Sequence, residues 1–421
     1  MEKLKCGMFV CQVWKHSLGV GLMFLLPLAL FAQEAPQYKA EARLNAPNFT
    51  FRDEAILVTT FALPFEFICQ AQLSPSPPAG YTPAPTEYQW TVSSGRLEVE
   101  GNQCTWIDPE PGLQTIQVEG VIRYLPPPAS SIFSWQKPEI SAMFQAQEQL
   151  LVPVRSNLAN DTVNGFLIGD YPDPNDAQTL QAIGPKYLQK RITDHIEVYQ
   201  PPKLFYEVTE ESWGLAFYEG YSLGDFDLDP RFSDLTYPRY IALHPTIVRK
   251  LVLFETFLQS QGISVSKFDI FYGFRSPAYN LGEMNKDGED SLKTPFSMHM
   301  YGRAADFIID EDGDLRLDDL NGDGKLSVDD SRELKRLGLA FSRQLMQAGS
   351  DELIGGVGNY FHHDYWERGE YAQTPYLHLD TRGFTAENGT IIEWETRPTI
   401  DVSLRNDPYR LKKPVPNFPF F

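Results

Sequence analysis

The sequence predicts a multidomain protein in which an all-β N-terminal module precedes a C-terminal α+β domain. Three observations carry this prediction. The chain has 421 residues, which is long for a single compact core. Short runs rich in β-branched and aromatic residues recur over residues 40–155. Segments with apolar residues at helical spacing alternate with strand-like runs over residues 236–400.

Residues 1–32 have the pattern of a signal peptide. Lys3, Lys5 and Lys15 precede an apolar run over Leu18–Ala32, and this order is typical of export signals. The run is shorter than the ~20 residues that a spanning helix needs, and no second run of spanning length follows. We therefore expect a periplasmic or secreted protein of the cell envelope, with no stable membrane span after signal removal. An uncleaved membrane anchor is the alternative.

The charge of the chain bears on its partners. The formal net charge is −20, whereas 42% of the residues are hydrophobic. A nucleic-acid-binding protein needs a basic face to neutralise phosphates, so we expect no nucleic-acid partner. The hydrophobic fraction is that of a globular protein and excludes a wholly disordered chain.

The module over residues 40–155 is expected to be a β-sandwich. Turn-forming stretches separate its predicted strands, which cover Ala55–Phe61, Phe65–Gln72, Tyr88–Val92, Gln114–Tyr124 and Gln149–Pro153. The order of Trp90, Gly95, Trp106 and Gly112 resembles that of immunoglobulin-like or polycystic-kidney-disease-type domains. Residues 156–235 are predicted to form a linker or accessory segment that packs on the next domain.

Two cysteines lie outside the predicted signal peptide. An even pair in an exported chain predicts one disulfide, here between Cys69 and Cys104. The alternative is a pair of unpaired buried thiols.

The domain over residues 236–400 is predicted from its periodicity, and residues 401–421 are predicted to be a C-terminal tail. Helices are expected over Thr246–Gln261 and Ser331–Ala348, because apolar residues recur there every three or four positions and a glycine follows each. Phe268–Tyr272 and Ala305–Ile309 are predicted strands.

Histidine and carboxylate residues of this domain form two blocks. His299 lies seven positions before Asp306, which is on a predicted strand. His378 and Asp380 share one face of another strand, because side chains alternate along a strand. Two imidazoles and a carboxylate with an open fourth position are an arrangement of catalytic zinc, which acidifies bound water and polarises carbonyls. On local spacing alone, a surface His–Asp pair remains the alternative.

A third block surrounds Arg275, which follows a predicted strand in the turn Gly273–Pro277. An arginine placed there can bind a carboxylate through two hydrogen bonds. A structural surface arginine is the alternative.

Together these blocks resemble the zinc D-Ala-D-Ala metallopeptidases, the superfamily that shares its fold with the hedgehog N-terminal domain. The similarity extends from Tyr272 to Trp394 and rests on two motifs. These are Ser-x-His-x-x-Gly-x-Ala-x-Asp, ending at Asp306, and Gly-Gly-Val-Gly-x-Tyr followed by His-Leu-Asp-Thr-Arg-Gly, ending at Gly383. The second motif is similar to the peptidoglycan endopeptidase branch.

The resemblance implies a hedgehog/DD-peptidase-like α+β zinc domain. It implies that His299, Asp306 and His378 bind zinc and that Arg275 binds substrate. The implied activity is hydrolysis of an amide bond in peptidoglycan stem or cross-link peptides by an exported zinc peptidase.

One position departs from the family pattern. Many members carry an acidic residue three positions before the last ligand, as general base, and this chain has Pro375 there. Asp380 is the substitute candidate for catalysis, and the alternative is a carboxylate that orients a ligand ring. His362, His363, Asp364 and Glu367 are predicted to be loop residues outside the metal site. The departure leaves a second hypothesis open, an inactive zinc- and calcium-bound protein that binds the cell wall or a partner.

An acidic insertion over residues 310–330 predicts calcium binding. It matches the twelve-residue calcium loop in its oxygen donors and in the glycine at position 6, and it resembles dockerin loops in ending on aspartate. The expected ligands are Asp319, Asn321, Asp323, Lys325 through its carbonyl, Ser327 and Asp330. Asp310, Asp312 and Asp314 form a second half-match, in which Leu315 replaces the glycine.

Overall fold

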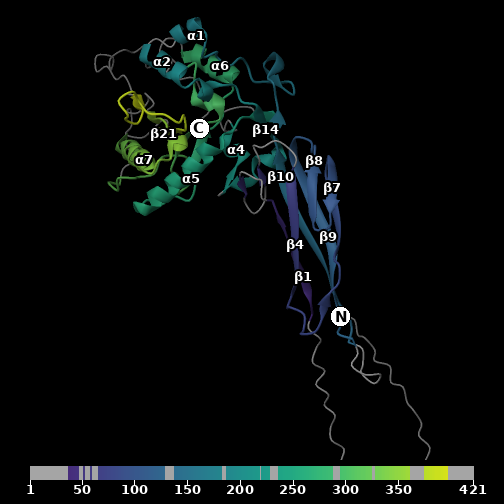
Figure 1. Cartoon of the computed structure of the whole chain (residues 1–421). Helices are drawn as coiled ribbons and strands as arrows, with labels where there is room; N and C mark the ends of the chain where they lie inside the picture. Colours follow the sequence, from purple (N-terminus) through teal and green to yellow (C-terminus); the bar gives the residue numbers. More distant parts are fainter. Residues whose placement is uncertain are drawn as a thin grey trace, which may run out of the picture. The chain divides into compact units, whose positions relative to one another are not determined.

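The computed structural model describes residues 37–46, 51–52, 57–58, 65–128, 137–182, 186–218, 220–227, 236–287, 294–324, 328–360 and 374–396. Its elements belong to one compact unit, Tyr38–Phe421. The described part is rich in β-strands and has few helices (Figure 1), which is consistent with the predicted β-rich multidomain fold. The predicted signal peptide (1–32) and tail (401–421) lie outside the described residues. Within the described part, no helix is long and apolar enough to cross a bilayer.

Two sheets share one core in the N-terminal region. The strands are β1 (Lys39–Asn45), β2 (Phe51–Arg52), β3 (Leu57–Val58), β4 (Phe65–Ser74), β5 (Thr82–Pro83), β6 (Glu87–Val92), β7 (Arg96–Glu100), β8 (Gln103–Ile107), β9 (Gly112–Leu125) and β10 (Ile140–Val152). One sheet has the order β1-β4-β8-β7, and the other β2-β3-β10-β9-β5 with β6 also on β9. Phe67, Trp106 and Val118 are buried between them. Side chains alternate along β4, where Phe65 and Phe67 are buried and Glu66 is exposed, as a two-layer arrangement requires.

The predicted strands of this region agree with the structure except at β10 and before β4. Strand β10 begins at Ile140 rather than Gln149, and its first part buries Ile140 and Phe144 between residues that are exposed or half-buried. Much of the predicted strand Ala55–Phe61 lies outside the described residues, and β3 covers Leu57–Val58.

Cys69 and Cys104 are free thiols in the structure, so the predicted disulfide is not formed. The β4–β8 register explains this result, because Cys104 lies opposite Phe67 and Cys69 is therefore a diagonal neighbour. Diagonal neighbours have Cβ atoms roughly 7 Å apart, whereas a disulfide needs about 4 Å. Burial raises the pKa of Cys69 to about 11 and that of Cys104 to about 12, so both side chains are protonated at neutral pH.

The C-terminal region mixes strands and helices. It begins with β11 (Val154–Arg155), β12 (Thr162–Val163), β13 (Phe166–Leu167), α1 (Ala177–Ala182), α2 (Lys186–Asp194), β14 (Leu204–Val208), α3 (Glu210–Trp213), β15 (Ala216–Tyr218), β16 (Tyr221–Ser222) and α4 (Leu223–Phe226). It continues with β17 (Arg239–Ile241), α5 (Pro245–Ser260), β18 (Asp269–Tyr272), α6 (Pro277–Asp287), β19 (Ala304–Ile308), α7 (Val328–Gln347), β20 (Val357–Tyr360), β21 (Tyr376–Asp380) and β22 (Glu393–Thr396).

The described part of residues 156–235 contributes to the core of this region. Phe205 and Phe226 are fully buried with Phe254 and Phe307 in one hydrophobic cluster. Strand β14 pairs with both β11 and β17. The segment also supports a later turn, because the Phe226 carbonyl accepts a hydrogen bond from the Phe274 N–H.

The two long helices form where the periodicity predicts them. Helix α5 buries Ile247, Leu251, Phe254 and Leu258, which lie three or four positions apart. Gly262 follows α5 and Gly349 follows α7, both with positive φ, the conformation in which glycine commonly ends helices.

Candidate metal centre

One row of residues runs across the five-stranded sheet of the C-terminal region. The strand order is β18-β19-β21-β20-β22. The pairing places Tyr272 opposite Asp306, Asp306 opposite His378, His378 opposite Gly358, and Gly358 opposite Trp394. Directly opposite residues point to the same face of a sheet. The register of the sheet therefore brings the two predicted strand-borne ligands side by side.

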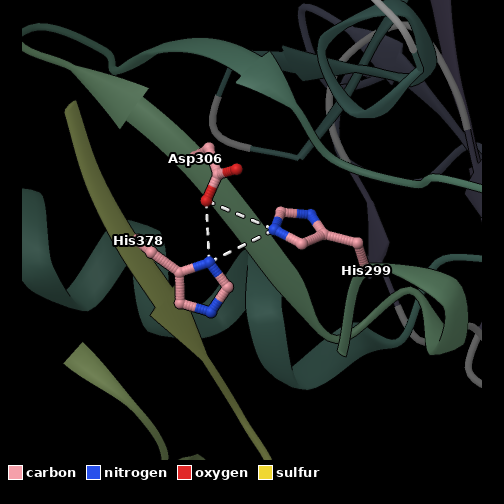
Figure 2. Close-up of side chains that lie close together, drawn as sticks. All are labelled: His299, Asp306 and His378. Carbon is pink, nitrogen blue, oxygen red and sulfur yellow. Dashed lines mark hydrogen bonds and ion pairs between the residues drawn. The ribbon is translucent and has the colours of Figure 1, made fainter. Parts of the chain in front are cut away.

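The three residues that the sequence singled out as ligands meet at one point, shown in Figure 2. Asp306 Oδ1 lies 2.7 Å from His378 Nδ1 and 3.2 Å from His299 Nε2. The two ring nitrogens are 3.2 Å apart. His299 comes from the 3₁₀ turn Met298–Tyr301, which lies just before strand β19 in the sequence. All three side chains are buried.

Each ring is held from behind by a second partner. His299 Nδ1 lies 2.7 Å from the Gly273 carbonyl, and His378 Nε2 lies 3.2 Å from Asp380 Oδ2. A carbonyl and a carboxylate can only accept, so these partners assign the protons to His299 Nδ1 and His378 Nε2. His299 Nε2 then directs its lone pair at the meeting point, and His378 Nδ1 does the same when a cation replaces the proton that it shares with Asp306.

This donor set fits a cation. Two lone pairs and the Asp306 carboxylate converge at 2.7–3.2 Å, an arrangement that needs positive charge at its centre. Three nitrogen and oxygen ligands, with both imidazoles oriented by an outer partner, match the way proteins build transition-metal sites. The residues present therefore fit a divalent metal ion.

The electrostatics of His299 and Asp306 agree with that fit, whereas at His378 a cation would have to displace a proton. Burial and the nearby Arg275 charge lower the pKa of His299 to about 4, so its ring is neutral and free to bind a metal. Burial alone would raise the pKa of Asp306, but His299 and His378 outweigh burial and hold it well below the ordinary value. Burial also opposes the charged form of His378, and its hydrogen bonds to Asp306 and Asp380 reverse this effect and raise its pKa.

Asp380 lies behind the His378 ring, and both of its carboxylate oxygens are occupied. Oδ1 accepts from the Gly356 N–H at 2.8 Å and from Arg382 Nε at 2.9 Å. Oδ2 accepts from Arg382 and from His378 Nε2. Burial raises the pKa of Asp380, but Arg382 and His378 outweigh burial and lower it well below the usual range. Of the two roles that the sequence left open, this geometry favours orientation of His378 over proton transfer.

Arg275 lies beside His299 and is buried, with 8% of its surface exposed. Its backbone N–H donates to the His299 carbonyl, and its Nη2 donates to Ser297 Oγ at 3.3 Å. Its Nε has no hydrogen-bond partner among the described residues. A buried guanidinium with an unsatisfied N–H can bind an anion that enters the site.

The Gly-Gly-Val-Gly motif makes room for Trp394, which sequence reasoning did not select. A Cβ at Gly358 would lie 2.2 Å from the Trp394 ring, and a Cβ at Gly356 would lie 2.6 Å from it. The indole packs against these glycines with its centroid 5.0 Å from that of His378. Tyr360, whose ring stacks on Tyr376 at 4.9 Å, extends this aromatic surface. The spacing of the glycines was a signal, but the pairing of β20 with β22 was needed to interpret it.

A polar network on the helix side of β21 was also missed. Lys250 on α5 is fully buried and donates to the Asp380 carbonyl at 2.8 Å. Thr246 lies one turn earlier, and its hydroxyl is 2.7 Å from that of Thr381. Arg303 Nη2 donates to His244 Nε2 at 2.8 Å. The position of Lys250 among the apolar residues of α5 was a signal that it is buried.

Two aspartate loops follow β19, the first over residues 310–315 and the second over residues 319–324. In the first, Asp310 accepts from the N–H groups of Gly313, Asp314 and Leu315 at 2.8–3.0 Å. Three acidic side chains of this loop, Asp310, Asp312 and Asp314, lie close enough together to hold a metal ion.

The second aspartate loop repeats this geometry nine positions later. Asp319 accepts from the N–H groups of Gly322, Asp323 and Gly324 at 2.7–3.2 Å. Leu315 has φ +66° and Gly324 has φ +76°, so the leucine adopts the backbone conformation of the glycine it replaces. Asp330 on α7 accepts from the backbone of Leu320 and Asn321 and closes the second loop onto the helix.

Several sequence candidates lie outside the described residues. Among them are the expected calcium ligands Lys325 and Ser327. The four residues that the sequence assigned to a loop, His362, His363, Asp364 and Glu367, also lie there.

Comparisons with protein-family models, with curated proteins and with solved structures found no match.

Proposed function

We propose that the protein is an exported zinc peptidase of the cell envelope that hydrolyses an amide bond in peptidoglycan peptides. The observation that carries the proposal is the convergence of His299, Asp306 and His378 on one point, with both rings oriented from behind. The resemblance of the surrounding motifs to the zinc D-Ala-D-Ala metallopeptidases supports the choice of metal and of substrate.

In this proposal the three side chains would hold zinc, with a fourth position open to the substrate. Zinc in such a site supplies Lewis acidity, which polarises a carbonyl and acidifies water. His299 keeps its proton on Nδ1 toward Gly273, and His378 keeps its proton on Nε2 toward Asp380. These contacts hold the rings in the orientation that binding requires.

Arg275 supplies the second part of the proposed substrate site. Its side chain is buried next to Ser297, and its free Nε–H is suited to a carboxylate, the group that terminates or branches from wall peptides. The charge at this position would fix the peptide relative to the metal centre and cost little reorganisation, because Arg275 is already held in place.

A non-catalytic binding protein is the second candidate, and the surroundings of Asp380 favour it. Pro375 takes the place of the usual acid, and the Asp380 carboxylate is occupied by Arg382, Gly356 and His378. A protein with this site would bind zinc and wall peptide without turnover, since neither residue is available to accept a proton from water.

A muropeptide mass profile separates the two candidates. Purified protein loaded with zinc is incubated with intact peptidoglycan sacculi, beside His299→Ala and Arg275→Met variants. New monomers or shortened stems from the wild type alone would support a hydrolase, and their masses would name the bond. An unchanged profile from folded, zinc-loaded protein would contradict the peptidase proposal, and retention on sacculi would then support the binding protein.

We also propose that the aspartate loops bind calcium. Oxygen donors at alternating positions with a sharp turn are the ligand pattern of this ion. Partial burial and neighbouring carboxylates raise the pKa of Asp318, and partial burial raises that of Asp310, which indicates negative charge that a cation would relieve. Isothermal titration calorimetry with calcium tests this proposal. If the wild-type protein gives no heat of binding, the proposal is rejected.

A further inference from the structure

The buried face of α5 carries a positive charge that the proposed reaction does not use. Ile247, Leu251 and Phe254 make this face apolar, yet Lys250 between them is fully buried. Placing an ammonium group in a protein interior costs free energy, and an apolar side chain of the same length would avoid that cost. The burial of the Lys250 ammonium group therefore needs a structural explanation.

The contacts of Lys250 are made with the strand that carries His378. Its Nζ donates to the Asp380 carbonyl at 2.8 Å, and Thr246, four positions earlier, contacts Thr381. Residues four apart lie on one face of a helix. Helix α5 thus contacts two consecutive residues at the end of β21, one through a charge and one through a hydroxyl.

The Asp380 peptide is confined on its other side as well. A Cβ at Gly355 would lie 2.0 Å from the Asp380 carbonyl oxygen, so the backbone of this turn packs directly against it. The Asp380 carboxylate is held separately, by the Gly356 N–H and Arg382. Lys250 therefore holds the main-chain carbonyl of Asp380, whose N–H donates to the Gly356 carbonyl, while the other two contacts fix its side chain.

We propose that Lys250 is a positioning residue of the metal centre, which holds Asp380 so that its carboxylate orients the His378 ring. The inference rests on the part of the proposed function in which His299, Asp306 and His378 bind zinc. Lys250 touches neither the metal nor the substrate. It acts through the peptide of Asp380 and through its positive charge, which favours the carboxylate that receives the His378 Nε2 proton.

The test compares two substitutions by methionine at neighbouring positions of helix α5. Lys250→Met keeps the length of the side chain and removes its charge and hydrogen bond. Arg249→Met removes a charge from the exposed neighbouring position, where Arg249 pairs with Glu352 at 3.3 Å. Zinc affinity is measured by chelator competition, and the absorption spectrum of the cobalt-substituted protein reports ligand geometry.

We expect Lys250→Met to weaken zinc binding about 10- to 100-fold, the range found when an outer partner of a ligand is lost. Its cobalt spectrum should shift, whereas Arg249→Met should keep both the affinity and the spectrum of the wild type. Wild-type affinity and an unshifted spectrum in folded Lys250→Met would overturn the inference.

Two further measurements keep the inference testable. If Lys250→Met does not fold, Lys250→Gln replaces it, because glutamine keeps a neutral hydrogen-bond donor. Zinc binding should again be weaker than in the wild type. Wild-type zinc affinity in Lys250→Gln would contradict the positioning role of Lys250. In an Asp380→Asn background, Lys250→Met should reduce zinc affinity less than it does in the wild type, because both residues act on the His378 ring. Additive losses of affinity would overturn the proposal.

A wild-type protein that binds no zinc would refute the proposed function as well. That outcome is distinct from zinc binding that is insensitive to Lys250.

Discussion

The metal centre and the aspartate loops both gather groups that can bind a cation, but they are built in opposite ways. In the metal centre the donors come from residues far apart in the sequence and are buried, and a second partner holds each of the two rings. In the loops Asp310 and Asp319 are bonded to backbone N–H groups within five residues of themselves. The comparison teaches that the tertiary fold sets the first site, whereas local sequence sets the second. The two sites should therefore respond differently to substitution, acid and added metal.

The largest expected difference concerns zinc affinity. Asp306→Asn removes the charge on which both imidazoles converge, so zinc binding should weaken by more than about 100-fold, beyond the loss of an outer partner. Asp314→Asn makes the same change in the first aspartate loop and should leave zinc affinity unaltered. Chelator competition measures both. Equal losses in the two variants would mean that the sites are not independent.

Acid should destabilise the network behind the metal centre. Burial and Arg303 lower the pKa of His244 to about 4 from 6.5. Below pH 6.5 the unfolded chain binds a proton that the folded chain refuses, so this histidine makes stability fall as the pH drops from 6.5 to 4. The contribution is on the order of 3 kcal/mol.

The measurement is urea unfolding at several pH values. The free energy of unfolding of His244→Gln should fall less steeply over this range than that of the wild type. His195→Gln, which removes a histidine outside the network, should follow the wild type. Parallel curves for His244→Gln and the wild type would contradict the assignment.

A smaller effect is expected from the glycines under Trp394. The Cβ of Gly358→Ala would lie 2.2 Å from the indole, and such overpacking costs about 1–3 kcal/mol. Gly282→Ala is the matched control, since this glycine lies in α6 and a Cβ there meets no neighbour. The control should gain about 0.5–1 kcal/mol from helix propensity. Chemical denaturation measures both, and a neutral Gly358→Ala would show that Trp394 moves freely.

The smallest effect is expected at the aspartate loops. Calcium at ten times its dissociation constant should stabilise the wild type by about 1.4 kcal/mol. A double variant, Asp310→Asn and Asp319→Asn, keeps one of the two oxygens that accept N–H groups in each loop and loses two charges, so it should gain less from calcium. Thermal unfolding with calcium and with magnesium measures this gain. An unchanged gain in the double variant would place calcium elsewhere.

Sequence reasoning succeeded where the determining information is local. The spacing of Leu251, Phe254 and Leu258 predicted helix α5, and alternation placed His378 and Asp380 on one face. The motifs identified three side chains that the structure brings together. The helix and the shared strand face depend on periods of 3.6 and two residues, which a single segment displays. The ligand set came instead from the resemblance of two separate motifs to a known family.

The features that were missed depend on register and on contacts between distant segments. The offset of Cys69 from Cys104 follows from the pairing of β4 with β8. The meeting of Gly358 and Trp394 follows from the parallel pairing of β20 and β22. The role of Lys250 depends on a helix and a strand that are 130 positions apart. The pattern of residues within one segment carries no information about which distant segment it will contact.

The row of residues across the five-stranded sheet has a consequence for how such a chain can change in evolution. Deleting one residue inside β19 or β21 would turn Asp306 or His378 to the opposite face and abolish the centre. Length added between the strands leaves the row intact, and the aspartate loops lie in one such connection, between β19 and α7. We expect natural insertions and deletions to accumulate in the connections and to be excluded from these two strands, so that the ligands keep their register while their spacing along the chain drifts.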